Sequence, residues 1–286
     1  MITYSDFGIN GRLGNQMFQY AALFATAKRL NTQCFLPSRM HKNASNFETI
    51  NDLMEFSPDG FEGSKYFRFI QYVDQYNKYI LTQFTKNYRE PTFCFDPNFL
   101  NIKDNTNITG FFQSEKYFKE YRKELIDIFT LKVPSQKACD YRNFIDENKP
   151  TSIHIRRGDY VNKTNFHNSL ADTLYYCSSV EKIKEMDPKR KFLVFSDDIS
   201  FCKNYFQNYL EEYVDDFFYV AGTTGPEEIK LQSFCKDNII ANSSFSWWGA
   251  WLNENPNNKV IAPLNWFGPD GPKDTQDVYC DGWIKL

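Results

Sequence analysis

In the first half of the chain, the hydrophobic pattern predicts a helix followed by a short strand. Apolar residues recur at the spacing of one helix face, at Met17, Tyr20, Ala21, Phe24 and Ala27. A glycine-bearing turn at 11–16 precedes this helix, which we expect to end near residue 31. The segment 34–37 has the composition of a strand stopped by proline. Further along, 108–112 predicts a strand and turn, and 116–129 predicts an amphipathic helix.

The second half alternates between predicted strands and helices. Short apolar segments predict strands at 152–155, 192–195, 217–220, 238–241 and 259–262. Helical patterns lie between most of them, at 174–186, 226–235 and 245–254. Strands that alternate with helices at this spacing form parallel, doubly wound sheets. A polar stretch between Pro134 and Pro150 separates the halves, so we expect two domains, 1–148 and 149–286.

Three of the predicted strands end in polar clusters. The first reads HIRRGDY from residue 154, the second SDD from residue 196, and the third NSSFS from residue 242. Ligands of open parallel sheets bind outside the carboxyl ends of the strands. We therefore expect the three clusters to lie together at one edge of the sheet.

Each cluster suits one part of a guanosine diphosphate. Arg156 and Arg157 offer planar, paired donors for phosphate oxygens. A helix start holds anions through hydroxyls and free backbone N–H groups, here at Ser243, Ser244 and Ser246. A carboxylate at Asp197 or Asp198 can accept two N–H bonds from a guanine edge. Taken singly, each cluster also fits a surface turn or an ordinary helix cap; their joint occurrence favours a nucleotide pocket.

Composition and charge exclude several other classes of protein. The 286 residues carry a net charge of −3, whereas duplex nucleic-acid binders usually have a basic excess. Seven cysteines without a CxxC pair and only three histidines indicate reduced thiols and no structural metal site. The N-terminus lacks a signal-peptide pattern, and no apolar run approaches the ~18 residues of a membrane span. We expect a cytoplasmic protein, at most peripherally associated with a membrane.

Five segments between residues 11 and 252 carry a resemblance to a known family. They read LGNQMFQYA at 13–21, GFFQSEKYF at 110–118, HIRRGDY at 154–160, FLVFSDD at 192–198 and NSSFSWWGAWL at 242–252. In this order they resemble GGLGNQMFQYA, GYFQSEKYF, HxRRGDY, FxxFSDD and the third motif of the alpha-1,2-fucosyltransferase family, glycosyltransferase family 11. Arg12 stands where that family more usually has glycine, which bears on the local turn and on acceptor contacts.

The resemblance implies an α/β fold of GT-B type, in which two Rossmann-like domains face a central cleft. The N-terminal domain would shape the acceptor site, and the C-terminal domain would hold GDP-fucose. In wider relatives, the alpha-1,6- and protein O-fucosyltransferases, positions similar to His154 and Asp197 lie beside the guanosine, and one similar to Arg156 lies on the diphosphate. The expected GDP-fucose contacts are Gly14, Asn15, His154, Arg156, Arg157, Asp197, Asp198, Asn242, Ser243, Ser244 and Ser246.

The implied reaction is transfer of L-fucose from GDP-beta-L-fucose to the 2-hydroxyl of a terminal beta-galactoside, with inversion. No isolated Asp-x-Asp follows a strand, so we expect Arg156 first, and Arg157 second, to neutralise the leaving diphosphate without a metal ion or cofactor. Asp159 and Glu115 are candidate bases for the acceptor hydroxyl. A third possibility is that no strong base acts, because an oxocarbenium-like sugar is already electrophilic.

Two alternatives remain at this point: a GDP-sugar transferase with another sugar or linkage, and a non-catalytic glycan-binding module. The aromatic content of 18% fits either. A lectin, however, has no need of arginines, aspartates and serines at three strand ends, and it should be indifferent to GDP. The acceptor is expected to be a galactose-terminated oligosaccharide or a surface polysaccharide.

Overall fold

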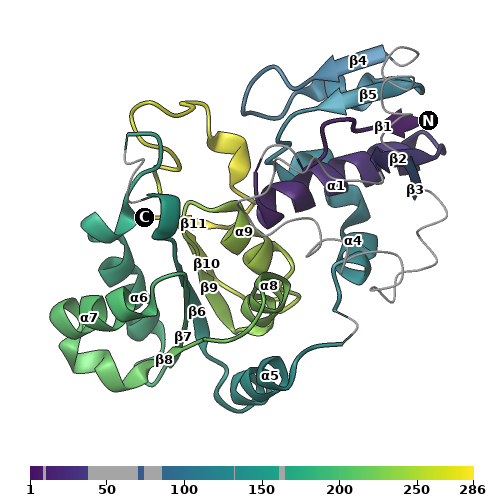
Figure 1. The fold of residues 1–286 in the computed structure, drawn as a ribbon. Coiled ribbons are helices and arrows are strands. Elements are labelled where there is room, and N and C mark those ends of the chain that lie inside the picture. Colours follow the sequence, from purple (N-terminus) through teal and green to yellow (C-terminus); the bar gives the residue numbers. More distant parts are fainter. Residues whose placement is uncertain (9–10, 38–69, 74–85, 132, 161–164) are drawn as a thin grey trace. The chain divides into compact units, whose positions relative to one another are not determined.

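The computed structural model describes residues 1–8, 11–37, 70–73, 86–131, 133–160 and 165–286 (Figure 1). The chain forms two compact units. Unit 1 comprises Met1–Val133 and Asp274–Cys280, and unit 2 comprises Pro134–Lys273 and Asp281–Leu286. This division differs from the expected boundary between residues 148 and 149.

The difference arises from helix α5 (Gln136–Asn148), which the sequence analysis treated as a polar boundary stretch. The Ser135 hydroxyl caps α5 by accepting a hydrogen bond from the Ala138 N–H at 3.2 Å. Ile145 of α5 is fully buried in an apolar cluster with Leu193 and Phe195 of the unit 2 sheet. Because α5 buries its apolar face against that sheet, it belongs to unit 2.

Unit 1 is built on a parallel sheet. Among the described residues its strand order is β3-β2-β1-β5-β4. The strands are β1 (Ile2–Thr3), β2 (Cys34–Pro37), β3 (Ile70–Val73), β4 (Lys86–Arg89) and β5 (Thr106–Thr109). Helix α1 (Leu13–Arg29) is buried from Leu13 to Ala27 except at Asn15, which is half-buried. This broad burial explains why its apolar residues extend beyond one face.

The helix predicted at 116–129 is wrong in its first part. Short 3-10 helices at Glu115–Tyr117 and Lys119–Tyr121 precede α4 (Arg122–Ile128). Phe118 interrupts the helix with a φ of −150°. Since both Tyr117 and Phe118 are fully buried, this break lets two consecutive aromatic rings enter the core.

Unit 2 holds a second parallel sheet, and it confirms the predicted alternation. Its strand order is β11-β10-β9-β6-β7-β8. The predicted strands are present as β6 (Thr151–Ile155), β7 (Phe192–Ser196), β8 (Phe217–Tyr219), β9 (Asp237–Ile239) and β10 (Val260–Ala262), and β11 (Ile284–Lys285) follows. The chain runs outward from β6 to β8 and then returns to β9 on the other side of β6. The topological switch point of the sheet therefore lies between β6 and β9.

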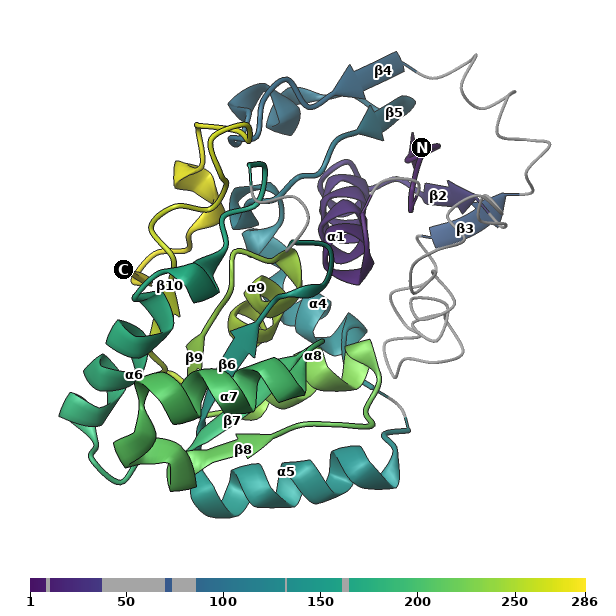
Figure 2. The ribbon, with the colours of Figure 1, turned by 60° about the vertical axis from the view of Figure 1, so that its left-hand side comes forward.

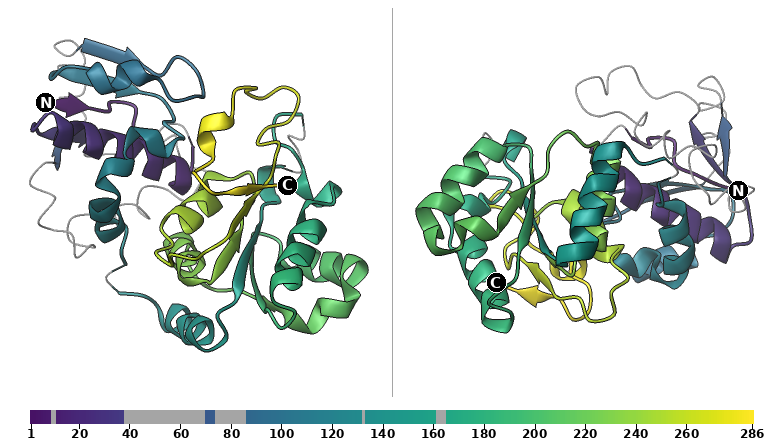
Figure 3. Two further views of the ribbon diagram at one scale, coloured as in Figure 1. Left: turned by 180° about the vertical axis from the view of Figure 1, so that it is seen from behind. Right: turned by 90° about the horizontal axis from the view of Figure 1, so that it is seen from below.

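Helices cover both faces of this sheet (Figures 2 and 3). They are α5, α6 (Tyr175–Met186), α7 (Ile199–Tyr209), α8 (Gly225–Phe234) and α9 (Ser244–Trp251). Alternate residues of one strand enter opposite cores: Val194 packs with α6 and α7, and Leu193 packs with α5 and α8. The sequence analysis did not predict α7. No helix among the described residues is long and apolar enough to cross a membrane.

Candidate functional site

The three polar clusters of unit 2 meet at the carboxyl ends of β6, β7 and β9. Arg156 from the first cluster forms an ion pair with Asp197 from the second. The Tyr160 hydroxyl, also from the first, donates a hydrogen bond to the Asn242 carbonyl of the third at 3.0 Å. The prediction that these clusters share one edge of the sheet is therefore confirmed.

Asp197 holds the two arginines of the first cluster in place. Its Oδ2 lies 2.5 Å from Arg156 Nη1, and its Oδ1 accepts the Arg157 backbone N–H at 2.9 Å. The Arg156 side chain is 17% exposed and that of Asp197 is 28% exposed. A Cβ added at Gly158 would lie 2.5 Å from Asp197 Oδ2, so only glycine leaves room for this pair. Asp197 therefore orients Arg156, and its predicted contact with guanine stays a prediction.

The two adjacent arginines have different surroundings. The Arg157 guanidinium carbon lies 3.7 Å from the centre of the Phe201 ring, a close cation–π contact with α7. Its Nε is buried without a hydrogen-bond partner among the described residues. Arg156 stays at the strand end, and its guanidinium carbon lies 5.8 Å from the centre of the Tyr160 ring. The two arginines therefore have different neighbours, and their predicted roles at the diphosphate stay predictions.

His154 is a buried, neutral imidazole. It is 5% exposed, and its ring centre lies 5.2 Å from that of Phe245 at the start of α9. Burial lowers the pKa of His154 to about 4, against an opposing effect of Asp197. Its Nδ1 has no hydrogen-bond partner among the described residues. Buried polar atoms are normally bonded, so this nitrogen is a group that a bound molecule or a water would satisfy.

Asp198 has a structural role in the fold. Its Oδ1 accepts the Phe201 N–H at 3.0 Å and so caps the N-terminus of α7. The Ser196 hydroxyl in turn accepts the Asp198 N–H at 3.0 Å. Of the two adjacent aspartates, Asp198 caps a helix and Asp197 faces the arginines.

The third cluster builds the turn between β9 and α9. Asn242 donates through its amide nitrogen to the carbonyls of Asn168 and Trp266, both at 3.0 Å. Ser243 caps α9, and the Ser246 hydroxyl accepts the Ala241 N–H at 3.2 Å. Ser244, in the first turn of α9, is half-buried, and its hydroxyl has no hydrogen bond to any described residue. The turn thus begins α9 beside the first cluster, and its predicted contacts with phosphate stay predictions.

The remaining predicted residues are Asp159, from the first cluster, and three residues of unit 1. Asp159 is in a short 3-10 helix after β6, and its side chain is outside the described part of the chain. Gly14 and Asn15 begin α1 in unit 1, where the Gln113 amide donates to Asn15 Oδ1 at 2.7 Å. Glu115 is also in unit 1, and its Oε1 lies 3.9 Å from Lys119 Nζ. Their predicted roles stay predictions.

Sequence reasoning missed Glu90, which holds the 110–118 motif in place. Its Oε2 accepts the N–H groups of Phe111 and Phe112 at 2.7 and 3.0 Å. Burial raises the pKa of Glu90 to about 7, although these bonds favour the carboxylate. A Cβ at Gly110 would lie 2.5 Å from Glu90 Cβ, which accounts for the glycine. A lone glutamate in a segment without periodicity offers no signal from which this contact could be predicted.

No group of three or more His, Cys, Asp or Glu side chains with the arrangement of a metal site occurs in the part of the chain that the structure describes. Independence from metals stays an expectation that an assay must test.

Residues 2–286 match the family described as Glycosyl transferase family 11. The chain belongs to this family. It is 35% identical over 285 residues to an alpha-1,2-colitosyltransferase of Escherichia coli, covering 96% of each chain. It is 24% identical over 255 residues to a galactoside 2-alpha-L-fucosyltransferase, SEC1, of Bos taurus, covering 85% of this chain and 62% of that protein. The family predicted from the five segments is confirmed.

A solved structure also resembles this family 11 chain. It is POFUT1 in complex with GDP-fucose, which aligns with a TM-score of 0.50 and 15% identity, over 91% of this chain and 96% of that one. At this identity the likeness concerns the fold alone. This chain likewise forms two units, each built on a parallel sheet. The predicted GT-B fold class is confirmed.

Proposed function

We propose that this family 11 glycosyltransferase transfers L-fucose from GDP-beta-L-fucose to the 2-hydroxyl of a terminal beta-galactoside. The observation that supports the proposal most directly is Arg156, held by Asp197 at 2.5 Å at the carboxyl edge of the unit 2 sheet. Nucleotides bind at this edge, beside the switch point, in doubly wound folds. The name of the Bos taurus relative supports fucose as the donor sugar and a galactoside as the acceptor.

Unit 2 supplies the donor chemistry in this proposal. Arg156 faces the leaving diphosphate, and the first turn of α9, with Ser243 and Ser244, receives a second phosphate oxygen. Negative charge grows on the diphosphate as the glycosidic bond breaks, so a fixed guanidinium stabilises the transition state more than the ground state. One such donor contributes ~3–4 kcal/mol. Neutral His154 adds no competing charge beside the guanosine.

The acceptor chemistry belongs to unit 1 in this proposal. Gln113 joins the 110–118 motif, which contains Glu115, to Asn15. Gly14 and Asn15 are the predicted contacts of this unit with GDP-fucose. The acceptor hydroxyl loses its proton to Glu115, to Asp159, or late to solvent. Inversion at the sugar carbon requires one in-line displacement, and the products are GDP and the alpha-1,2-fucosyl galactoside.

A second donor deserves a direct test, because the more similar relative is named a colitosyltransferase. Colitose is fucose without its 3-hydroxyl, so GDP-colitose presents the same nucleotide and the same methyl group. The two donors therefore differ by one hydrogen-bonding group in the sugar pocket. A site that hydrogen-bonds the 3-hydroxyl should reject GDP-colitose strongly, whereas a site that does not would accept both.

The test is a transfer assay with GDP-fucose and GDP-colitose over a panel of galactosides, with product linkage read by NMR. Turnover with GDP-fucose and an alpha-1,2 linkage is the expected result. Calorimetry with GDP provides the control for a lectin, which would bind the galactoside and ignore GDP. GDP binding with exclusive use of GDP-colitose would correct the donor, and an alpha linkage at another carbon would correct the acceptor position.

The cellular setting follows from the same proposal. GDP-sugars are cytoplasmic metabolites, so the enzyme would act in the cytoplasm or peripherally at the inner face of a membrane. The acceptor would be a galactose-terminated oligosaccharide or a growing surface polysaccharide. The net charge of −3 supports neither nucleic acid nor a broadly anionic surface as the partner.

A further inference from the structure

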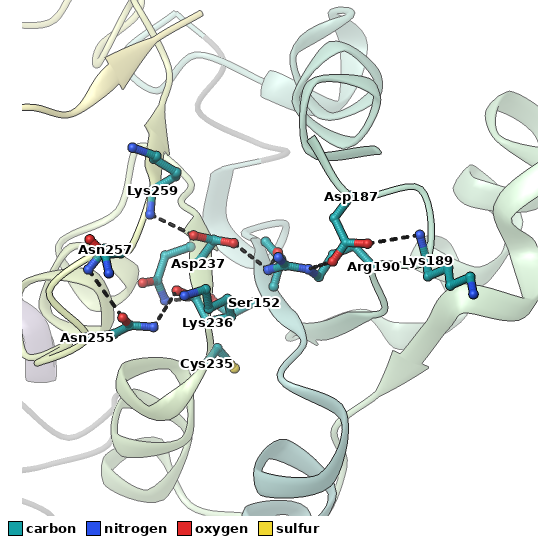
Figure 4. Close-up of polar contacts among 12 residues, drawn as sticks. Ser152, Asp187, Lys189, Arg190, Cys235, Lys236, Asp237, Asn255, Asn257 and Lys259 are labelled. Carbon is teal, nitrogen blue, oxygen red and sulfur yellow. Dashed lines mark hydrogen bonds and ion pairs between the residues drawn. The ribbon is translucent and has the colours of Figure 1, made fainter. Parts of the chain in front are cut away.

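Unit 2 carries a polar pocket at the amino ends of its strands. The pocket has a volume of about 530 Å³, within the range of small-molecule sites. Its wall is formed by the ends of α5, α8 and α9 and by the segments that lead into β7 and β9. Figure 4 shows part of this wall, with Asp187, Lys189, Arg190, Lys236 and Asn255 around the start of β9. Because β6 has five residues, its two ends lie about 13 Å apart.

The lining of this pocket is positively charged. Six cationic side chains face three acidic ones, a formal excess of three positive charges. The cations are Arg142, Lys149, Lys189, Arg190, Lys230 and Lys236, and the acids are Asp146, Asp187 and Glu254. In a protein with a net charge of −3, this excess is a local feature and does not follow from the overall composition.

Two of the acids are already used by their neighbours. Asp146 pairs with Arg142 at 2.9 Å and with Lys149 at 3.5 Å. Asp187 accepts from Arg190 Nε at 3.1 Å, and Arg190 also binds Asp237 at 2.5 Å (Figure 4). Together the charges of Asp146, Asp187 and Asp237 balance those of Arg142, Lys149 and Arg190. The positive charge that remains belongs to Lys189, Lys230 and Lys236, against Glu254.

Lys230 is the unusual member of this set. Its residue is only 7% exposed, yet its ammonium makes no hydrogen bond or ion pair with any described residue. It lies 5.3 Å from the Phe234 ring centre, and Glu254 attracts it from a greater distance. Its Nζ is not among the fully buried side-chain atoms that lack a partner, so it opens onto the pocket, and its surroundings only partly desolvate the charge. Burial accordingly lowers its pKa to about 8, so it is still mostly charged at pH 7.

Helix ends explain some of these cations but not Lys230. The carboxyl ends of α5 and α8 lie at this edge, and cations near a helix C-terminus are favourable within the last turn. Lys149 directly follows α5, and Lys236 lies two residues after the end of α8. Lys230, however, precedes the last turn of α8, which ends at Phe234. The helix dipole therefore does not account for the position of this charge at the pocket.

We propose that this pocket binds a phosphate or diphosphate group, with the Lys230 ammonium as its anchor. Lys236 and Lys189 stand at the wall to complete the charge, and Leu252 and Phe234 offer an apolar surface to the rest of the ligand. The site is separate from the Arg156 cluster, because the two lie at opposite ends of the same strands. It thus goes beyond the proposed transfer reaction.

The test is calorimetric titration with pyrophosphate at saturating GDP, which keeps the donor site filled. Lys230→Met keeps the length of the side chain and removes the charge, and it should weaken pyrophosphate binding at least about tenfold, equivalent to ~1.4 kcal/mol. The matched control is Lys203→Met. Lys203 also lies near an aromatic ring, 5.4 Å from the centre of Tyr219, but it is exposed and outside the pocket. This control should bind pyrophosphate like the parent.

The melting temperature and the basal activity of Lys230→Met show whether a loss of pyrophosphate binding comes from the pocket or from misfolding. Lys230→Met should melt no lower than the parent and retain its GDP-fucose turnover, because it removes a partly desolvated charge away from the donor site. If that variant does not fold, Lys236→Met tests the same pocket at a half-buried position. The proposal would be overturned if the parent and the folded variant bound both pyrophosphate and phosphatidic acid vesicles equally, or if the parent bound neither.

A second experiment distinguishes a lipid headgroup from a free phosphate compound as the ligand. Vesicles of phosphatidylcholine with and without phosphatidic acid are sedimented with the parent, Lys230→Met and Lys203→Met proteins. Binding that needs both phosphatidic acid and Lys230 identifies a lipid headgroup. Pyrophosphate binding without vesicle binding identifies a free phosphate compound. Either result supports the site, and binding independent of Lys230 in both arms refutes it.

Discussion

Replacing Arg156 by lysine separates a catalytic role from a structural one. Lysine keeps the positive charge but loses the planar fork of parallel donors. If the fork stabilises the departing diphosphate, kcat should fall at least about tenfold, equivalent to ~1.4 kcal/mol. GDP-fucose affinity should fall less, because the additional charge appears only as the bond breaks.

The burial of the Arg156–Asp197 pair indicates how much stability Arg156→Lys would lose if Arg156 had only a structural role. The Arg156–Asp197 pair is only partly buried, with side chains 17% and 28% exposed. Exposed pairs contribute up to ~1 kcal/mol of stability. For a protein of this size, that corresponds to roughly 2–4 °C in Tm. A purely structural role therefore predicts a small loss in Tm with kcat unchanged.

Steady-state kinetics and thermal melting of the same variant distinguish the two roles. The matched control is Arg190→Lys, because Arg190 also lies 2.5 Å from a carboxylate, Asp237, but at the amino edge of the sheet. It should lower Tm and leave kcat intact. Asp197→Asn should lower kcat in the same direction as Arg156→Lys, and the double variant should lose less than the sum of the two. Parental turnover in a folded Arg156→Lys protein would refute the assignment and pass the role to Arg157.

Three further predictions follow from individual contacts. Gly158→Ala should lower kcat and Tm together, since its Cβ would meet Asp197 Oδ2 at 2.5 Å; a crystal structure with an unmoved Arg156–Asp197 pair would contradict this. Burial raises the pKa of Glu90 in the folded protein to about 7, against its ordinary 4.5. The protonated carboxyl therefore stabilises the folded state below pH 4.5, and this stabilisation is lost as pH rises through 7. As pH rises from 4.5 to 7, the free energy of unfolding of Glu90→Gln should therefore increase relative to that of the parent, as measured by denaturant titration. A difference between the two proteins that does not change with pH would exclude Glu90 as the cause. Activity should survive excess EDTA, and loss of turnover that manganese restores would show that a metal neutralises the diphosphate.

Much of unit 2 follows from local sequence. The apolar segments predicted β6, β7, β8, β9 and β10 to within about two residues at each end, and helical spacing predicted α6, α8 and α9. The polar clusters after three of these strands predicted one shared edge. Such inferences succeed because strand burial and parallel alternation leave a pattern in neighbouring residues. The five family segments identified the family for the same reason, since each is continuous in the chain.

Tertiary structure alone decided which residue does what within those clusters. Asp197 and Asp198 are indistinguishable in sequence, yet one bonds arginine groups forty residues earlier and the other caps α7. Glu90 supports the 110–118 motif across twenty residues of chain, and Lys230 is buried by helices that adjoin only in the fold. Hydrogen bonds, ion pairs and desolvation depend on distance in space. Hydrophobic periodicity records which side of an element is buried, and it carries no information about which polar group lies opposite.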